Sequence, residues 1–343
     1  MKIPTTSTPF HNRAATLDDL DIAVHLINTY SKHYLDTIEA SKEIFYNEWI
    51  SPGFNPKTDI QLVFSSNQEL IGYVEVWDNA NPPVHPWVWW CVHPDHTKRG
   101  VGSFLLSWAE NRARMALDRC PDNTRVAFRS GADQAIKPAK ETMKKHGMVN
   151  IRHSFHMQIN MEIPPPNPDW LEGIRLKTFD LENDDLVDIY KADVEAFQDH
   201  FGFVESPFKE GFKRFKHFMT NEESYAPGLW FLAMTEGSTN REEIVGFCLN
   251  RKHSFEDPSI GWVSSLGVLR PWRNLGIGLA LLLHSFGEYY RRGYRRVGLG
   301  VDAENLTGAL NLYKTAGMHI HRRSDLYEKE IRPGVEISVQ SLE

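Results

Sequence analysis

The sequence predicts a mixed α/β protein built from two tandem copies of one domain. Three observations support this prediction: the length of 343 residues, a set of sequence landmarks that occurs twice in the same order, and a proline-rich connector between the two sets. A domain usually contains about 100 to 200 residues, so this length suggests two domains. Within each copy, strand-like and helix-like segments alternate, which is typical of a mixed α/β fold with a mixed sheet.

The repeat consists of four landmarks. They are an Arg-x-x-Thr-x-Asp sequence before a helix-like run, a strand-like apolar run with a glycine, a Gly-x-Gly sequence, and a Gly-Met pair after a second helix-like run. The two copies pair residues 13–18 with 175–180, 70–76 with 244–249, 99–102 with 275–278, and 144–148 with 314–318. Four ordered landmarks at nearly constant spacing indicate duplication of a unit of about 165 residues.

The connector gives the predicted boundary. Residues 162–170 contain four prolines, which disfavour helix and favour an extended chain. We therefore predict an N-terminal domain of residues 1–162, a linker of residues 163–172, and a C-terminal domain of residues 173–343.

In the second copy, three apolar segments read as strands because they are rich in aromatic and aliphatic residues. The segments are residues 230–234, 243–249 and 261–268. Residues 278–292 read as a helix, with two arginines in its last turn and Gly293 placed to end it.

Composition excludes several protein classes. Apolar residues make up 41% of the chain and charged residues 24%, as in ordinary globular proteins. No apolar run approaches the roughly 18 residues of a membrane helix, and the first residues lack the apolar core of a signal peptide, so we expect a cytoplasmic protein without a membrane partner. The formal charge of −7 argues against nucleic acid as a partner.

The three cysteines, Cys91, Cys120 and Cys248, are too scattered for a disulfide framework or a paired zinc site. The segment 91–96 has a cysteine and two histidines, but it offers no second ligand pair. We therefore predict no metal.

The Gly-x-Gly sequence of the second copy stands between a strand and a helix. Backbone N–H groups at a helix start can face an anion, so Gly276 and Gly278 suggest a phosphate site. A P-loop is excluded because no Gly-Lys-Ser/Thr follows, and the dinucleotide fingerprint is excluded because Leu281 stands where a third glycine is needed. On its own this sequence also fits a plain tight turn.

The wider pattern resembles the GNAT acetyltransferase superfamily. Residues 273–280 match its pyrophosphate-binding sequence R/Q-x-x-G-x-G/A, and residues 305–317 match its later helix sequence N-x-x-x-A-x-x-x-Y-x-x-x-G. These motifs lie within residues 266–317, and the duplication extends the likeness over nearly the whole chain. The tandem arrangement is similar to that of mycothiol synthase and related two-domain acetyltransferases, a likeness of architecture that does not identify the substrate.

The resemblance implies acetyl-CoA as the co-substrate. The Asn305 side chain would hydrogen-bond the pantetheine arm, and Leu266 and Val268 would supply the strand edge that this arm joins. The backbone around the turn would surround the pyrophosphate, with the contributing residues being Arg273, Asn274, Leu275, Gly276, Ile277, Gly278, Leu279 and Ala280.

Acetyl transfer needs a neutral amine, but a free alkyl amine has a pKa near 10 and is mostly protonated at pH 7, so a base or a water chain is required. The departing CoA thiolate needs a proton, and the resemblance implies Tyr313 as the general acid. A buried helical tyrosine that only packs against the sheet is the alternative. The base is undefined, and Asp199, His200 and Glu205, which follow the first helix of the second copy, are candidate acceptor-site residues.

The first copy departs from the pattern. Met143 stands opposite Tyr313, Ala135 opposite Asn305 and Thr97 opposite Arg273, so both the proton donor and the pantetheine amide are missing. The glycines of its turn, Gly100 and Gly102, are retained, so cofactor binding there remains open. We predict a non-catalytic N-terminal domain.

The function predicted from the sequence is an acyltransferase that moves an acetyl group from acetyl-CoA to the primary amine of a small molecule or of an amino terminus. The alternative is a non-catalytic acyl-CoA-binding or regulatory module. A small-molecule amine is the expected partner, and a monomer and a homodimer both remain open.

Overall fold

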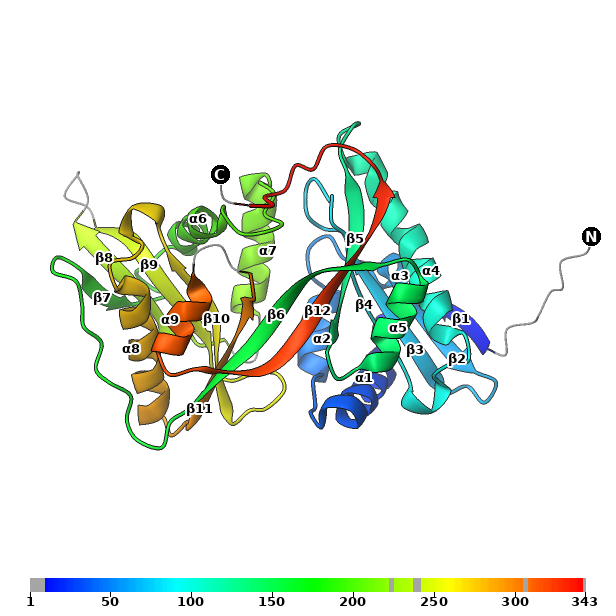
Figure 1. Cartoon of the computed structure of the whole chain (residues 1–343), viewed down its shortest axis with the longest axis horizontal. Coiled ribbons are helices and arrows are strands. Elements are labelled where there is room, and N and C mark those ends of the chain that lie inside the picture. Colours follow the sequence, from blue (N-terminus) through cyan, green and yellow to red (C-terminus); the bar gives the residue numbers. More distant parts are fainter. Residues whose placement is uncertain (1–9, 222–224, 237–241, 305–307, 342–343) are drawn as a thin grey trace, which may run out of the picture. The chain divides into compact units, whose positions relative to one another are not determined.

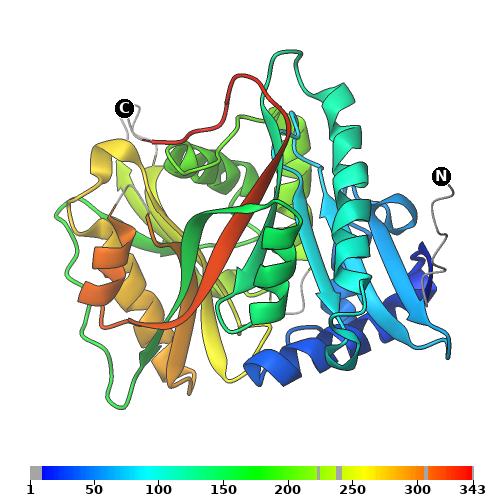
Figure 2. The same cartoon turned by 45° about the vertical axis from the view of Figure 1, so that its right-hand side comes forward.

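The computed structural model (Figures 1 and 2) describes residues 10–221, 225–236, 242–304 and 308–341. The chain divides into two compact units. Unit 1 comprises the described residues of Met1–Ile151 together with Leu326–Glu336. Unit 2 comprises those of Arg152–Asp325 together with Ile337–Glu343.

Unit 1 contains a mixed sheet with the strand order β1-β2-β3-β4-β5, followed by the C-terminal residues of β12 (His319–Arg332). The first four strands are antiparallel and β5 is parallel to β4. The strands are β1 (Phe10–Ala14), β2 (Ile60–Ser65), β3 (Leu70–Trp77), β4 (Trp87–Val92) and β5 (Val126–Asp133). The helices are α1 (Leu20–Leu35), α2 (Lys42–Trp49), α3 (Pro56–Asp59), α4 (Val101–Arg114) and α5 (Lys137–Lys145).

Side-chain alternation along β3 separates the helices of unit 1 onto two faces of the sheet. Gly72 faces α4, because a Cβ there would lie 2.7 Å from a methyl carbon of Val101. The next residue, Tyr73, faces α2 and accepts a 3.3 Å hydrogen bond from the indole N–H of Trp49. The core of unit 1 thus fills both sides of the sheet.

Unit 2 repeats this plan with the strand order β6-β11-β10-β9-β8-β7. Strands β10 and β11 are parallel, and the other pairs are antiparallel. The strands are β6 (Val149–Asn160), β7 (Arg175–Thr178), β8 (Trp230–Glu236), β9 (Glu242–Arg251), β10 (Ile260–Val268) and β11 (Arg296–Asp302). The helices are α6 (Leu186–Phe197), α7 (Phe208–Thr220), α8 (Ile277–Arg291) and α9 (Ala309–Thr315).

The faces of the second sheet are also distinct. A Cβ at Gly246 would lie 3.3 Å from Ile277 and Leu281 of α8, whereas a Cβ at Gly267 would lie 2.9 Å from Ala196 of α6. Helix α8 therefore covers one face and α6 the other, with α9 beside α8 and α7 beside α6. The mixed α/β fold predicted from the sequence is confirmed, as are the three strands and the helix predicted within residues 230–292.

The predicted domain boundaries do not coincide with the compact units. Residues 152–160 of β6, placed by the sequence in the N-terminal domain, belong to unit 2 and pair with β11 from Ser154↔Asp302 to Asn160↔Arg296. Residues 326–336, placed in the C-terminal domain, belong to unit 1, where Glu328 accepts hydrogen bonds from Arg125 and Arg129 at 2.5 and 2.9 Å. The apolar pattern of a strand does not specify its partner, because duplicated domains offer similar edges.

None of the helices in the described parts of the chain has the length and apolar character needed to cross a membrane.

Candidate active site

The glycine turn has the same backbone conformation in both units. Gly100 has φ 85° and ψ -9°, and Gly276 has φ 85° and ψ -10°. Two positions earlier, Lys98 and Asn274 have φ angles of 61° and 63°. Each turn leads into a helix, α4 or α8, whose first N–H groups have no acceptor within the helix. Both turns can therefore donate hydrogen bonds to a phosphate.

Two parallel strands separate beside each turn. In unit 2 the ladder between β10 and β11 covers residues 260–263 of β10, although β10 continues to Val268. In unit 1 the ladder between β4 and β5 covers Trp87 and Val88, although β4 continues to Val92. In the parts of the chain that the structure describes, the neighbouring parallel strand does not pair with the backbone edge beyond each ladder. An extended ligand such as a pantetheine arm would add to this edge as a strand does.

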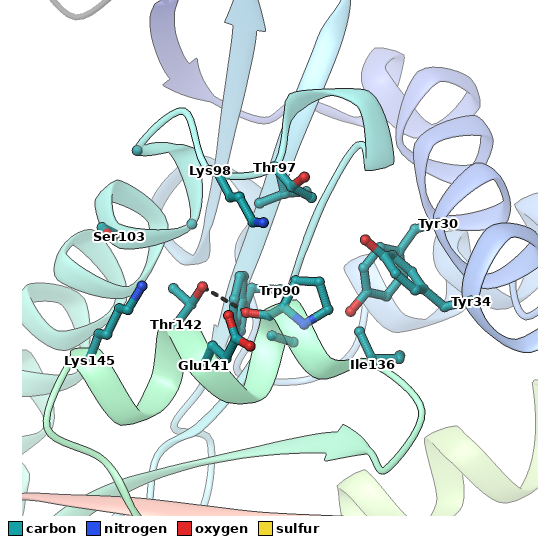
Figure 3. A pocket seen from close by; sticks show the side chains of 15 residues that line it. Tyr30, Tyr34, Trp90, Thr97, Lys98, Ser103, Ile136, Glu141, Thr142 and Lys145 are labelled. Carbon is teal, nitrogen blue, oxygen red and sulfur yellow. Dashed lines mark hydrogen bonds between the residues drawn. The ribbon is translucent and has the colours of Figure 1, made fainter.

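In unit 1 this region opens onto a cavity of about 460 Å³ (Figure 3). Lys98 and Lys145 bring positive charge to its wall, and Tyr30 and Tyr34 of α1 line it from the other side. A cavity of this size with convergent polar groups is typical of a small-molecule site. Both predicted cofactor residues of unit 1, the turn glycines, lie in its wall.

Gly102 lies at a close contact between α4, β4 and α5 in this wall. A Cβ at Gly102 would lie 3.1 Å from the indole ring of Trp90 and 3.2 Å from the methyl group of Thr142. In unit 2, a Cβ at Gly278 would lie 2.9 Å from Leu312 and 3.5 Å from Val268. In each copy the second glycine of the turn thus allows a close contact between two helices: α4 with α5 in unit 1 and α8 with α9 in unit 2.

Arg273 has internal partners. Its guanidinium donates to the carbonyl oxygens of Val268 at 3.1 Å and Ala196 at 2.9 Å, and to Asp199 Oδ2 at 2.7 Å. These bonds join the end of α6 to the end of β10. A phosphate contact at this turn would therefore rest on backbone N–H groups rather than on this side chain.

The other residues of the predicted pyrophosphate turn have mixed surroundings. Asn274 lines a cavity of about 780 Å³ together with Arg270 and residues 337–341. Leu275 is exposed, Leu279 is half-buried, and Ile277 and Ala280 are buried in the core of unit 2. Because their side chains are apolar, Leu275, Ile277 and Leu279 would contact an anion through backbone N–H groups, whereas the Ala280 N–H donates to the Gly276 carbonyl oxygen at 3.0 Å.

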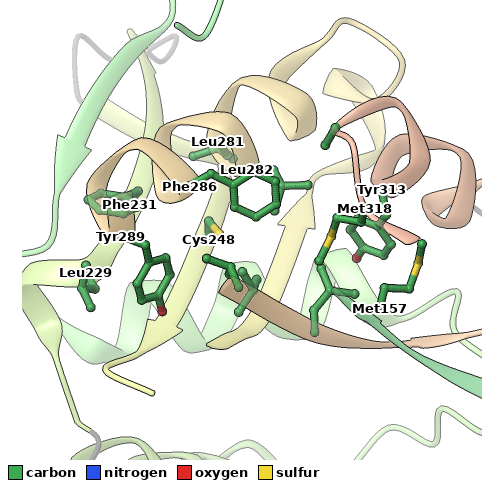
Figure 4. Close-up of a cluster of buried hydrophobic side chains, with 14 of the residues drawn as sticks. Met157, Leu229, Phe231, Cys248, Leu281, Leu282, Phe286, Tyr289, Tyr313 and Met318 are labelled. Carbon is green, nitrogen blue, oxygen red and sulfur yellow. The ribbon is translucent and has the colours of Figure 1, made fainter. Parts of the chain in front are cut away.

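Tyr313 lies on α9 within the hydrophobic core of unit 2 (Figure 4), where its side chain is 7% exposed and lies beside Met157 and Met318. Burial raises the pKa of Tyr313 above its usual value, so the phenol is protonated at neutral pH. The position suits a proton donor and also fits the packing alternative. Leu266 and Val268 are half-buried on β10, and Asn305 lies outside the described residues.

The three candidate acceptor residues have different surroundings. Asp199 is buried, and its oxygens accept hydrogen bonds from Arg270 and Arg273. It is thus a structural ion-pair partner and does not offer a free carboxylate. His200 packs against Phe197 with ring centroids 4.5 Å apart, and its pKa is lowered by burial and by the charge of Arg273. Glu205 is exposed.

Sequence reasoning missed Asp193, which lies on α6. Its Oδ1 accepts a 3.1 Å hydrogen bond from the hydroxyl of Ser265 on β10, beyond the end of the ladder with β11. Burial raises the pKa of Asp193 to about 6. The signal was present in the sequence: Asp193 falls in the apolar stripe of α6, four residues after Ile189 and three before Ala196.

Unit 1 has Met143, fully buried, where unit 2 has Tyr313. It also holds a buried carboxyl group that the sequence analysis did not single out. Glu75 on β3 accepts hydrogen bonds from the hydroxyl of Tyr73 at 2.5 Å and from the indole N–H of Trp77 at 2.9 Å. Burial raises the pKa of Glu75.

Three possible metal ligands come together in unit 1, although the sequence around residues 91–96 offered no second ligand pair. Glu69 joins His93 and His96, and the three ligand atoms lie within 4.8 Å of one another. The Nδ1 atom of His93 accepts a 3.3 Å hydrogen bond from the N–H of Asp95, which leaves Nε2 as the protonated nitrogen of the neutral ring. Nε2 lies 3.8 Å from Glu69 Oε1. This arrangement suits a histidine–carboxylate contact better than metal coordination.

Comparison with known proteins gives consistent results. The model of the acetyltransferase (GNAT) family matches residues 25–127 and 186–318, more than half of the chain. A mycothiol acetyltransferase from Thermobispora bispora is 29% identical over 259 residues, which cover 75% of this chain and 79% of that protein.

Solved structures extend the likeness over the whole chain. A GCN5-related N-acetyltransferase from Sphaerobacter thermophilus is 35% identical with a TM-score of 0.77, covering 99% of this chain and 100% of that one. A tandem GNAT protein from the clavulanic acid biosynthesis pathway has a similar fold, with a TM-score of 0.68 at 14% identity and coverage of 95% and 100%.

Proposed function

Because this chain belongs to the acetyltransferase (GNAT) family and is an acetyl-CoA-dependent N-acetyltransferase, we propose that unit 2 carries the chemistry. Its acceptor is the primary amine of a small molecule or of an amino terminus. The observation that carries this proposal is the combination, in unit 2, of the glycine turn, the separated edge of β10 and the phenol of Tyr313. In unit 1 the position of the phenol is occupied by Met143.

Each part has a defined chemical task. The turn from Arg273 to Ala280 would hold the pyrophosphate through backbone N–H groups, and the β10 edge would align the pantetheine arm. Backbone groups of Leu266 and Val268 would polarise the thioester carbonyl as it gains negative charge. Tyr313, kept protonated by burial, would give its proton to the departing thiolate.

For unit 1 we propose acyl-CoA binding without turnover. The cavity beside Gly100 and Gly102 is lined by Lys98 and Lys145, whose positive charge would attract phosphates, and also by Glu141. Its turn has the conformation found in unit 2. A chain in which both units only bind acyl-CoA is the competing function. The relatives named above are transferases, and no comparison favours a non-catalytic module.

Thiol release from acetyl-CoA, measured over a panel of primary amines and amino-terminal peptides, tests the function. The three cysteines, Cys91, Cys120 and Cys248, are buried, so a thiol reagent should report mainly free CoA. Amine-dependent release accompanied by the acetylated amine supports the proposal. Tight acetyl-CoA binding without release over the whole panel would support the competing function.

Two matched variants test the division between the units. Gly278→Trp and Gly102→Trp each place a ring against the close helix contact beside one turn. We expect Gly278→Trp to abolish turnover and Gly102→Trp to remove one acetyl-CoA binding event in calorimetry while turnover persists. Circular dichroism confirms that each variant is folded. Loss of turnover in Gly102→Trp together with full activity in Gly278→Trp would assign the chemistry to unit 1.

A further inference from the structure

Asp193 on α6 hydrogen-bonds to β10 beside the strand edge that we propose for the acyl-CoA. Ser265, its hydrogen-bond partner, is two residues beyond Val263, the last residue of β10 in the ladder with β11. The register of β10 against β9 also shifts between Val263 and Ser265, which marks a β-bulge. Asp193 thus contacts the part of β10 that, within the described residues, is no longer paired with β11.

Helix α6 is close to this segment of β10. A Cβ at Gly267 would lie 2.9 Å from the Cβ of Ala196, one turn after Asp193 on the same helix. Side chains alternate along a strand, so Gly267 faces α6 and Leu266 faces the opposite side, which α8 and α9 cover. An acyl group lying along the β10 edge would therefore have α9 on one side of the sheet and Asp193 on the other. Tyr313, on the α8 and α9 side, and Asp193, on the α6 side, therefore lie on opposite faces of the sheet.

The charges around Asp193 distinguish it from the other acids of unit 2. On its own helix Tyr190 interacts electrostatically with Asp193, and α7 contributes Arg214, which interacts with Tyr190. Strand β9 presents Phe247 to α6, and β10 presents the Ser265 hydroxyl. Among the described residues Asp193 forms no ion pair, whereas Asp199 is paired with two arginines.

We propose that Asp193 binds the ammonium group of the acceptor and accepts its proton as the amine attacks the thioester in unit 2. This inference rests on the function proposed above and adds the base and the charge of the acceptor. Ser265 donates to Oδ1, so Oδ2 and the second lone pair of Oδ1 are available to an N–H donor. The acceptor is thus a primary amine that enters as a cation.

The proton and electron balance is as follows. One N–H proton of the ammonium passes to the Asp193 carboxylate, and the freed nitrogen lone pair forms the N–C bond with the thioester carbonyl. As the tetrahedral intermediate collapses, the C–S bond breaks and its electron pair leaves on sulfur, which takes a proton from the phenol of Tyr313. The nitrogen loses its second proton, which restores the phenol, and Asp193 releases its proton to water. The products are an amide, CoA thiol and one proton.

A pKa near 6 suits this role, because the carboxylate is mostly ionised at pH 7 and still basic enough to accept a proton. The hydrogen bond from Ser265 lowers the pKa of Asp193, while burial raises it. Removing the serine hydroxyl should therefore move the titration of Asp193 to higher pH, a change that a purely structural hydrogen bond would not transmit to the kinetics.

The test is the pH profile of kcat/KM for acetylation of an alkyl amine from the panel. In the wild-type enzyme, kcat/KM should be level between about pH 6 and the pKa of the amine, and should fall below pH 6. In Asp193→Asn the amine must enter as its free base, so kcat/KM should rise tenfold per pH unit up to the amine pKa. At pH 7 it should be lower than wild type by about 10² to 10⁴.

Three controls accompany this measurement. Asp188→Asn removes an exposed carboxylate from the same helix and should leave the profile unchanged. Ser265→Ala should shift the acid limb to higher pH. Acetyl-CoA affinity, measured by calorimetry, should be equal in wild type and Asp193→Asn, which also shows that the variant is folded.

The outcomes separate the two proposals. A wild-type enzyme that acetylates no amine of the panel overturns the proposed function and, with it, the role of Asp193. A wild-type enzyme that turns over while Asp193→Asn keeps the same rate and the same acid limb overturns the role of Asp193 alone. A lower rate in Asp193→Asn with an unaltered acid limb overturns proton transfer to this carboxylate.

Discussion

Replacing Tyr313 with phenylalanine distinguishes proton donation from packing. The ring lies in the core of unit 2, 7% exposed, beside Met157 and Met318. Phenylalanine keeps the contacts of the ring and removes one hydroxyl. Among the described residues this hydroxyl has no hydrogen-bond partner, so the free energy of unfolding should change by less than about 1 kcal/mol.

The expected kinetic effect is much larger. If the phenol protonates the thiolate, its loss should lower the rate of the chemical step by about 10² to 10⁴, which corresponds to about 3 to 5 kcal/mol in the activation free energy. Acetyl-CoA affinity should change little because the turn and the β10 edge are untouched. Single-turnover acetylation is the appropriate assay, since product release can limit the steady-state rate.

Tyr289→Phe is the matched control. Tyr289 is fully buried in the same core, but its hydroxyl hydrogen-bonds backbone groups, including the carbonyl oxygen of Trp262 at 3.0 Å. This variant should lose about 1 kcal/mol of stability and keep its chemical step. A Tyr313→Phe enzyme whose single-turnover rate equals that of wild type would remove Tyr313 from the mechanism and leave it a packing role.

Two further predictions concern stability. Gly211→Ala should destabilise the protein, because a Cβ there would lie 1.9 Å from the Tyr190 hydroxyl oxygen. Gly287 is also within a helix, but a Cβ there would have nothing within 4 Å, so Gly287→Ala should stabilise the protein by up to about 1 kcal/mol. Thermal unfolding compares the two variants, and equal shifts in Tm would contradict the predicted contact. For Glu110, burial raises the pKa, but hydrogen bonds from Lys329 and Arg114 outweigh it and lower the pKa to about 2. Because the folded-state pKa is depressed, this contribution to stability is present above the unfolded-state pKa near 4.5 and is lost as the pH falls toward 2. Urea unfolding between pH 5 and 2 should show a shallower pH dependence for Glu110→Gln than for wild type, and parallel curves would refute the assignment.

The sequence predicted the elements that depend on local pattern. The strands and the helix between residues 230 and 292 follow from apolar runs and from terminating glycines, whose effects act over a few residues. The duplicated turn was also predictable, because Gly100 and Gly276 adopt a positive φ that few other residues tolerate. The binding roles of the turn residues and the chemistry of Tyr313 stay predictions.

Other features depended on contacts between distant residues. From the sequence, Asp199 was a candidate residue of the acceptor site. In the structure it forms ion pairs with Arg270 and Arg273, which lie more than 70 residues later in the chain, and these pairs give it a structural role. Asp193 was overlooked for the converse reason, since its partner Ser265 is also remote in sequence. A carboxylate shows in the sequence only its type, whereas its pKa and its availability depend on burial and on the groups that surround it.

The division of the chain shows the same limit at the level of domains. Four landmarks and a proline-rich connector established that the chain contains two copies of one unit. They could not show that residues 152–160 lie in unit 2 and residues 326–336 in unit 1. Local sequence determines that a segment is a strand, but pairing is determined by which edge gains hydrogen bonds and buried side chains in three dimensions, and duplicated domains present nearly equivalent edges.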